Sequence, residues 1–183
     1  MEINQFVEFS SAVLRSLPRD MDPTTTQSWI TNQRVLADIL RKALVPDSVS
    51  VAIQVSAVVL QPPYEGWELV DNDPNPVGTL ELELSEFLEP GEKYVEGDVM
   101  RDRAKKSGLM LGEQHARALL EQQECIPEAW RKFYLVFPGT VWRGRGGGLS
   151  VPYLYWYGGR WDLGFGWLGG GWVSGGRFVS LRK

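Results

Sequence analysis

The chain has 183 residues, 43% of them hydrophobic, with eight tryptophans and a formal net charge of −4 at pH 7. This length and composition predict a folded protein with one good core and a small additional unit. No apolar run is long enough to span a membrane, and the acidic, amphipathic start lacks the features of a secretory signal, so we expect a cytoplasmic protein. Cys125 is the one cysteine and His115 the one histidine, which excludes an internal disulfide and leaves too few ligands for a structural zinc site. We expect no metal and no cofactor.

The charge is unevenly distributed along the chain. Six basic residues and one acid follow Pro138, a net charge of +5, so the remainder carries −9. A basic segment can bind a polyanion. Here the basic residues are scattered among aromatic and glycine residues, and no nucleic-acid-binding motif is present, so we do not expect a nucleic-acid ligand.

Residues 1–46 are predicted to form a helical hairpin. Apolar residues recur at helical spacing from Ile3 to Leu17, where Leu17-Pro18 ends the first helix. Asp22-Pro23 offers an N-cap and a first-turn proline for a second amphipathic helix that continues to Pro46. The apolar faces of these two helices would be exposed to water unless another surface covers them. We therefore hypothesise that the hairpin docks on the main domain or tethers it to a constant partner.

Residues 47–183 are predicted to form one mixed α+β domain. Apolar alternation and helical stripes predict, in order, a strand at Val49–Val55, a loop at Tyr64–Pro76, a strand at Thr79–Leu84, helices at Gly97–Gly108 and Leu111–Glu124, a strand at Lys132–Phe137, an irregular region and a strand at Arg177–Lys183. His115 falls in the middle of the second of these helices, where we expect a surface or half-buried side chain.

The segment from about 142 to 177 alternates aromatic residues with small ones. From Trp161 to Trp167 the period is two, so Trp161, Leu163, Phe165 and Trp167 are expected on one face and the intervening residues on the other. Buried aromatic rings on the first face can hold the fold whatever the second face carries. The aromatic residues of this inward scaffold are expected to be Trp142, Trp156, Trp161, Phe165, Trp167, Trp172 and Phe178, together with Leu163.

The small residues share a second property. Asn is absent after Asn75, and Gly, Tyr, Asp, Val, Ser and Arg can each be reached from an Asn codon by replacing only its adenines. In this pattern the C-terminal third resembles the variable region of target proteins of diversity-generating retroelements. In that family an error-prone reverse transcriptase rewrites the end of the target gene with adenine-specific errors. The resemblance implies a C-type-lectin-like fold and a hypervariable surface that binds a ligand, with a protein as the expected macromolecular partner.

The resemblance also implies which positions vary and contact the ligand. Fourteen of the 20 glycines lie between Gly139 and Gly176. Since glycine supplies no side-chain contact, Arg145, Tyr155 and Tyr157 are the expected anchors. The full set of candidate ligand-binding positions is Gly144, Arg145, Gly146, Gly148, Tyr155, Tyr157, Gly159, Asp162, Gly164, Gly166, Gly169, Gly170, Gly171, Val173, Gly175 and Gly176.

Three other interpretations compete with this one. A flexible low-complexity tail would not carry five tryptophans between Trp142 and Trp172. A carbohydrate or cell-wall binding module would stack sugars on exposed aromatic rings, and it requires Trp156, Trp161 or Trp167 to be exposed. An enzyme is not expected, because Cys125 has no second cysteine and no serine or acid is spaced to form a triad with His115.

Overall fold

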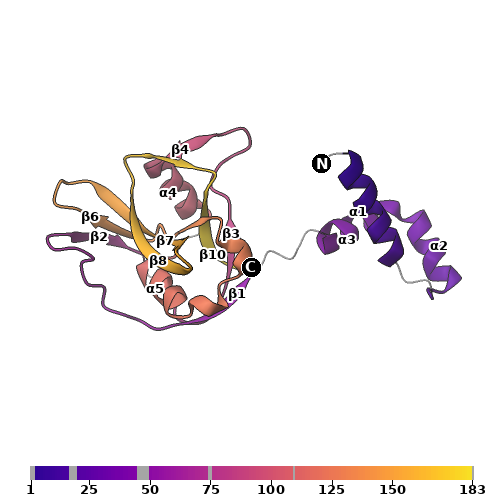
Figure 1. The fold of residues 1–183 in the computed structure, drawn as a ribbon, viewed down its shortest axis with the longest axis horizontal. Helices are drawn as coiled ribbons and strands as arrows, with labels where there is room; N and C mark the ends of the chain where they lie inside the picture. Colours follow the sequence, from indigo (N-terminus) through magenta and orange to yellow (C-terminus); the bar gives the residue numbers. More distant parts are fainter. Residues whose placement is uncertain (1–2, 17–19, 45–49, 74–75, 109, 183) are drawn as a thin grey trace. The chain divides into compact units, whose positions relative to one another are not determined.

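The computed structural model describes residues 3–16, 20–44, 50–73, 76–108 and 110–182. The chain divides into two compact units, Met1–Pro46 and Asp47–Lys183. Each unit is described by itself below (Figure 1). Within the described residues, no helix has the length and apolar character needed to cross a bilayer.

The described residues of the first unit form helices α1 (Ile3–Ser16), α2 (Pro23–Thr31) and α3 (Gln33–Leu44). Asp22 caps α2, because its carboxylate accepts hydrogen bonds from the Thr25 backbone N–H at 2.9 Å and from the Thr25 hydroxyl at 2.6 Å. The prediction of one helix from Pro23 to Pro46 was wrong. The backbone leaves the helical conformation at Asn32, whose N–H closes α2 on the Ser28 carbonyl, and α3 begins at the next residue. The predicted stops at Leu17-Pro18 and Pro46 lie outside the described residues.

The second unit is built on a mostly antiparallel eight-stranded sheet. Seven strands follow the order β1-β3-β10-β5-β7-β6-β2, and β8 pairs with β7. Only the β10–β5 pair is parallel among the described strands. The bounds are β1 Val51–Val55, β2 Glu68–Asn72, β3 Gly78–Ser85, β5 Tyr134–Val136, β6 Thr140–Arg143, β7 Leu149–Tyr157, β8 Arg160–Trp167 and β10 Gly176–Leu181. A separate pair joins β4 (Tyr94–Glu96) to β9 (Gly171–Val173).

One helix covers each face of the sheet, which gives two hydrophobic cores (Figure 1). Helix α5 (Glu113–Glu121) contributes Leu119 to the first core, with the short helices η1 (Gln123–Cys125) and η2 (Glu128–Trp130) beside it. Helix α4 (Gly97–Lys106) contributes Met100 to the second core. Neighbouring strand residues alternate between the cores, since Leu135 belongs to the first and Val136 to the second.

Three expectations for this unit were wrong. The segment expected as a loop at Tyr64–Pro76 contains β2, which pairs with β6 through a register shift between Leu69 and Asp71. The region after Pro138 that we expected to be irregular contains strands β6 to β9. His115 is fully buried, because α5 presents it to the Pro76 carbonyl and to the Gly112 N–H.

Candidate ligand-binding surface

The β7–β8 hairpin separates the alternating residues onto two faces. Its register pairs Tyr155 with Asp162 and Tyr153 with Gly164, so these four residues share one face. Trp156 pairs with Trp161 on the opposite face, where Trp161 is 2% exposed and packs in the first core. The strand period therefore places polar and glycine positions on the side of the hairpin that faces away from the first core.

Most of the expected inward scaffold is buried or half-buried. Trp142, Trp161 and Phe178 are at most 2% exposed, and Trp156, Leu163, Phe165 and Trp172 are partly buried. The edge-to-face contact between Trp156 and Trp161, with ring centroids 5.7 Å apart, is a favoured aromatic geometry.

Trp167 departs from the expected scaffold, since 61% of it is exposed. It is the last residue of β8 and, unlike Trp161, Trp156 and Leu163, it is not among the residues that form or pack against the first core. Glycine backbones occupy the space beside the ring: a Cβ atom added at Gly169 would lie 2.3 Å from it, and one at Gly148 would lie 3.1 Å from it. Trp167 therefore packs against backbone and presents the remainder of its ring to solvent.

Tyrosine side chains line the face of the hairpin that is turned away from the first core, here called the outward face, and one of them, Tyr153, packs against the second core. The ring centroids of Tyr134 and Tyr153 are 5.6 Å apart, and those of Tyr153 and Tyr155 are 5.7 Å apart. Tyr157 is 74% exposed at the end of β7. We define the tyrosine face as Tyr134, Tyr153, Tyr155, Tyr157, Asp162 and Gly164.

Two members of the tyrosine face were missed by the sequence analysis. Tyr153 could have been found, because Tyr153, Tyr155 and Tyr157 alternate along one strand. Tyr134 could not, because only the pairing of β5 with β7 brings it there. Burial, followed by the neighbouring Tyr155 and Tyr134, raises the pKa of the Tyr153 phenol above its usual value.

Four candidate glycines lie beneath aromatic rings, whereas we expected all the replaceable positions to face open solvent. A Cβ atom at Gly164 would lie 2.7 Å from Tyr153, and one at Gly166 would lie 2.5 Å from Trp172. Gly169 has the same relationship to Trp167, and Gly176 is buried with its added Cβ 2.7 Å from Phe87. A side chain at any of these positions would require a ring to move. Their contact with a ligand stays a prediction.

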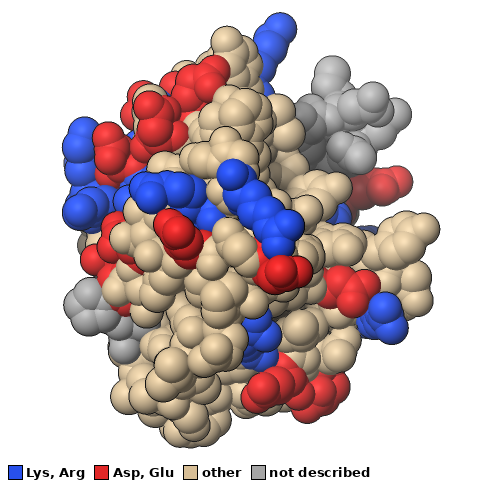
Figure 2. Space-filling model, turned by 90° about the vertical axis from the view of Figure 1, so that its left-hand side faces the viewer, with Lys and Arg blue, Asp and Glu red and all other residues tan. Residues whose placement is uncertain are grey.

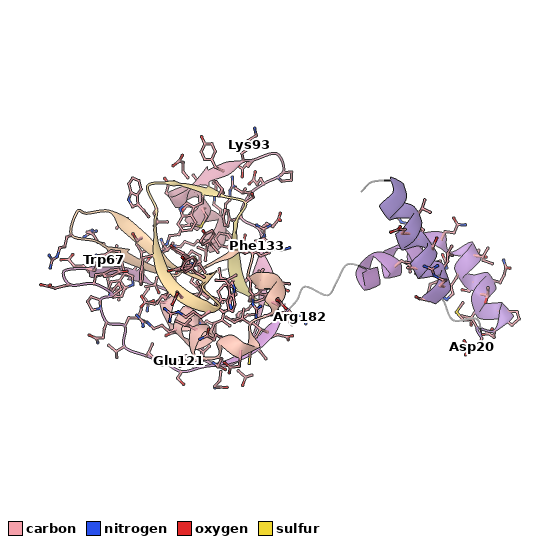
Figure 3. All side chains as sticks on the ribbon, viewed as in Figure 1. Asp20, Trp67, Lys93, Glu121, Phe133 and Arg182 are labelled. Atoms are coloured by element: carbon pink, nitrogen blue, oxygen red, sulfur yellow. The ribbon has the colours of Figure 1, made fainter. Side chains whose placement is uncertain are left out.

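The β6–β7 turn carries a second group of candidate positions, Gly144, Arg145, Gly146 and Gly148. Arg145 donates a hydrogen bond to the Glu65 carbonyl at 2.9 Å and forms an exposed ion pair with the same residue. A Cβ atom at Gly144 would meet Trp67, which lies at the β2–β6 end of this unit (Figure 3). A Cβ atom at Gly148 would contact the Trp167 ring. Trp167 and Gly166 are neighbours on β8, so their side chains point to opposite faces of the hairpin. This group therefore does not belong to the tyrosine face.

The remaining candidates lie in turns and around β9. Gly159 follows Gly158 in the two-residue β7–β8 turn, and both have positive φ angles, +87° and +59°. Val173 is 56% exposed on β9 and reaches the same hollow as Tyr134 and Tyr153. The other members of this group are Gly170, Gly171 and Gly175.

A separate polar cluster is buried near the start of α5. Glu113 and His115 are both fully buried, and Thr140 accepts a hydrogen bond from the Glu113 N–H at 2.8 Å. Burial lowers the pKa of His115. The described part of the chain contains no group of three or more His, Cys, Asp or Glu side chains placed to hold a metal ion. The cluster's polar atoms hydrogen-bond to one another and to the backbone, as a structural network does.

On the face seen in Figure 2, Lys and Arg side chains intermingle with Asp and Glu and with uncharged surface. The tyrosine face offers aromatic rings, phenol hydroxyls and one carboxylate to a ligand. Such a surface can make hydrogen bonds and apolar contacts. Comparisons of the chain with protein-family models, with curated proteins and with solved structures found no match.

Proposed function

We propose that this protein recognises a macromolecular ligand, a protein, through the tyrosine face of a C-type-lectin-like domain. In this proposal the candidate positions between about 142 and 177, which include Tyr155, Tyr157, Asp162 and Gly164 of this face, are diversified by adenine-specific mutagenesis from a retroelement, and the protein has no catalytic activity. The hypothesis that the first unit tethers the domain to a constant partner belongs to the same proposal.

One observation carries it: the two faces of the β7–β8 hairpin have different environments. Trp161 and Leu163 pack in or against the first core, while their neighbour Asp162 lies with Tyr155 on the outward face. The first-core contacts can therefore hold the hairpin while Tyr155, Tyr157 and Asp162 change, whereas Tyr153 on the same face packs against the second core. Tyrosine rings supply large contact area at low conformational-entropy cost, which suits recognition of proteins.

Substitutions on the two faces of the β7–β8 hairpin test whether one face holds the fold while the other can change. The triple change Tyr155→Ser, Tyr157→Ser and Asp162→Ser is expected to leave the free energy of unfolding within about 1 kcal/mol of the parent. By contrast, Trp161→Ala in the buried face should lower it by about 3–5 kcal/mol. Urea denaturation followed by tryptophan fluorescence measures both. A triple variant that unfolds as readily as the Trp161 variant would contradict the proposal.

The coding DNA tests the retroelement part. At the candidate glycine positions every codon should be GGC or GGT, because these arise from the Asn codons AAC and AAT by changing adenines alone. A near-identical template with adenines at those positions should lie nearby. Codons GGA and GGG distributed through the candidate positions would exclude this origin while leaving ligand binding open.

A carbohydrate ligand is the second candidate, because Trp167 is 61% exposed. Sugars stack on exposed aromatic rings, and Trp167 lies against glycine backbone while most of it stays accessible to solvent. Binding to an oligosaccharide array by the parent but not by Trp167→Ala, with the triple tyrosine-face variant unaffected, would favour this candidate. No glycan binding by the parent would exclude it.

A further inference from the structure

An apolar notch lies beside the tyrosine face, where β5, β7, β8 and β9 meet. It has a volume of about 170 Å³. Its lining has no charged side chain and includes Tyr134, Tyr153, Gly166, Trp172, Val173 and Gly176. The exposure of Tyr134 and Val173, 53% and 56%, shows that the notch opens to solvent.

Aromatic rings give the notch a fixed shape. The rings of Tyr134 and Tyr153 meet at an interplanar angle of 75°, so that they form two walls of a corner. Trp172 forms another part of the lining and is anchored, because it packs against the second core. A ligand group that enters would contact rings already held in place, which reduces the entropy lost on binding.

Glycines allow the rings to take these positions. Because Gly166 has no side chain, the Trp172 ring lies directly against β8, where an added Cβ would be 2.5 Å from it. Gly176 is packed in the same way against Phe87, at 2.7 Å. The absence of side chains at these two glycines therefore lets aromatic rings lie against the backbone beside the recess.

The volume decides what the notch can hold. Whole drug-sized ligands occupy pockets of roughly 300–1,000 Å³, so this recess is too small for one. An apolar cavity of about 150 Å³ is known to take up benzene. A single six-membered aromatic ring therefore matches the available space. The absence of charge in the lining disfavours a charged group, since burial of an unpaired charge is costly.

We propose that this notch is an anchor pocket for a phenylalanine side chain of the protein ligand. The inference rests on the proposed function, because it assigns a subsite within the same recognition surface. Anchoring residues at protein interfaces commonly fill desolvated pockets in this way. The tyrosine face then supplies the surrounding polar contacts.

The test uses the full chain, labelled with ¹⁵N, and N-acetyl-phenylalanine amide as the probe. Amide and indole N–H signals are followed during titration, with N-acetyl-lysine amide and tetramethylammonium as charged comparison probes. The phenylalanine probe is expected to shift the Trp172 indole, Gly166 and Gly176 signals and to saturate in the millimolar range, whereas the charged probes should not.

Two tyrosine variants provide a matched comparison. Tyr134→Ala removes one wall of the notch. It should weaken the affinity for the probe by about fivefold or more, an effect of the size that truncation of a contributing interface residue causes. Tyr64→Ala removes a ring that is 56% exposed, close to the 53% of Tyr134, but lies outside the notch. It should leave the affinity within about twofold.

Three other results of the titration would contradict the proposal of an anchor pocket. Shifts confined to Tyr155, Tyr157 and Asp162 would remove the pocket while leaving the tyrosine face as a recognition surface. Saturation by tetramethylammonium alone would assign the aromatic corner to a cation. No shift with any probe would also reject the pocket, and the proposed function would still be judged separately by the substitutions on the two faces of the hairpin.

Discussion

Trp142 and Glu113 form a hydrogen bond in the interior of the second unit. The indole Nε1 of Trp142 donates to Oε2 of Glu113 at 2.5 Å, and neither residue is more than 1% exposed. The other carboxylate oxygen accepts two hydrogen bonds from Arg117, one turn later on α5. This contact fastens the first turn of α5 to the end of β6, where Arg143, the last residue of the strand, leads into the β6–β7 turn.

Removal of the Glu113 carboxylate should destabilise the domain strongly. Glu113→Ala leaves the Trp142 N–H buried without an acceptor, and the expected loss in free energy of unfolding is about 3 kcal/mol. Glu128→Ala serves as the control, because Glu128 is exposed and its ion pair with Arg131 lies on the surface, so its loss should stay below about 1 kcal/mol. Equal losses in urea denaturation would contradict the role of the buried contact.

Acidification should weaken the domain through His115. Its Nε2 donates to the Pro76 carbonyl and its Nδ1 accepts from the Gly112 N–H, so the folded state holds the ring neutral. Burial is the main cause of its lowered pKa, relative to an unperturbed value of 6.5. Since the unfolded chain binds this proton more readily, the stability from His115 is complete above pH 6.5 and is lost as the pH falls toward the lower folded pKa.

The measurement is the pH dependence of unfolding between pH 7.5 and 5.5. The His115 contribution should reduce the free energy of unfolding by at most about 1.4 kcal/mol for each pH unit below 6.5. His115→Gln should remove this contribution, although the variant starts from a lower stability. The same slope in the parent and the variant would assign the pH dependence to other groups.

The β7–β8 turn should tolerate a side chain at one glycine better than at the other. Gly158, with φ +59°, has the left-handed conformation that Asn adopts, so Gly158→Asn should change the free energy of unfolding by less than about 1 kcal/mol. Gly159 has φ +87°, and Gly159→Ala should cost about 1–2 kcal/mol. Thermal unfolding of the two variants gives the comparison. An unchanged unfolding temperature for Gly159→Ala would contradict this expectation and show that the turn can take another backbone conformation.

Deletion of residues 1–46 should leave the second unit folded. Within the described residues, both hydrophobic cores consist of side chains from Val51 onward. A protein comprising residues 47–183 should therefore keep a cooperative thermal transition and dispersed NMR signals. Loss of both would show that the first unit is needed for folding of the second.

Local patterns predicted the elements whose partners are near in sequence or whose faces have contrasting environments. Val51, Ile53 and Val55 are buried along β1 while Ala52 and Gln54 are exposed, as period-two alternation indicates. The Asp22 cap was predictable because its hydrogen-bond partner, Thr25, is three residues away. In contrast, β2 could not be recognised, because four of its five residues are exposed and a mixed turn-like sequence surrounds it.

The sequence by itself determined that aromatic and small residues alternate along β8, since a strand sends successive side chains to opposite faces. Only the tertiary structure decided where the core beneath that strand ends, which leaves Trp167 exposed and Trp161 buried. It also decided that Tyr134 joins Tyr153 and that Trp172 lies over Gly166. The first contact joins two strands through the β5–β7 pairing, and the second depends on how the chain turns between β8 and β9, so both positions follow from the packing of whole strands and rings, which a local pattern does not contain.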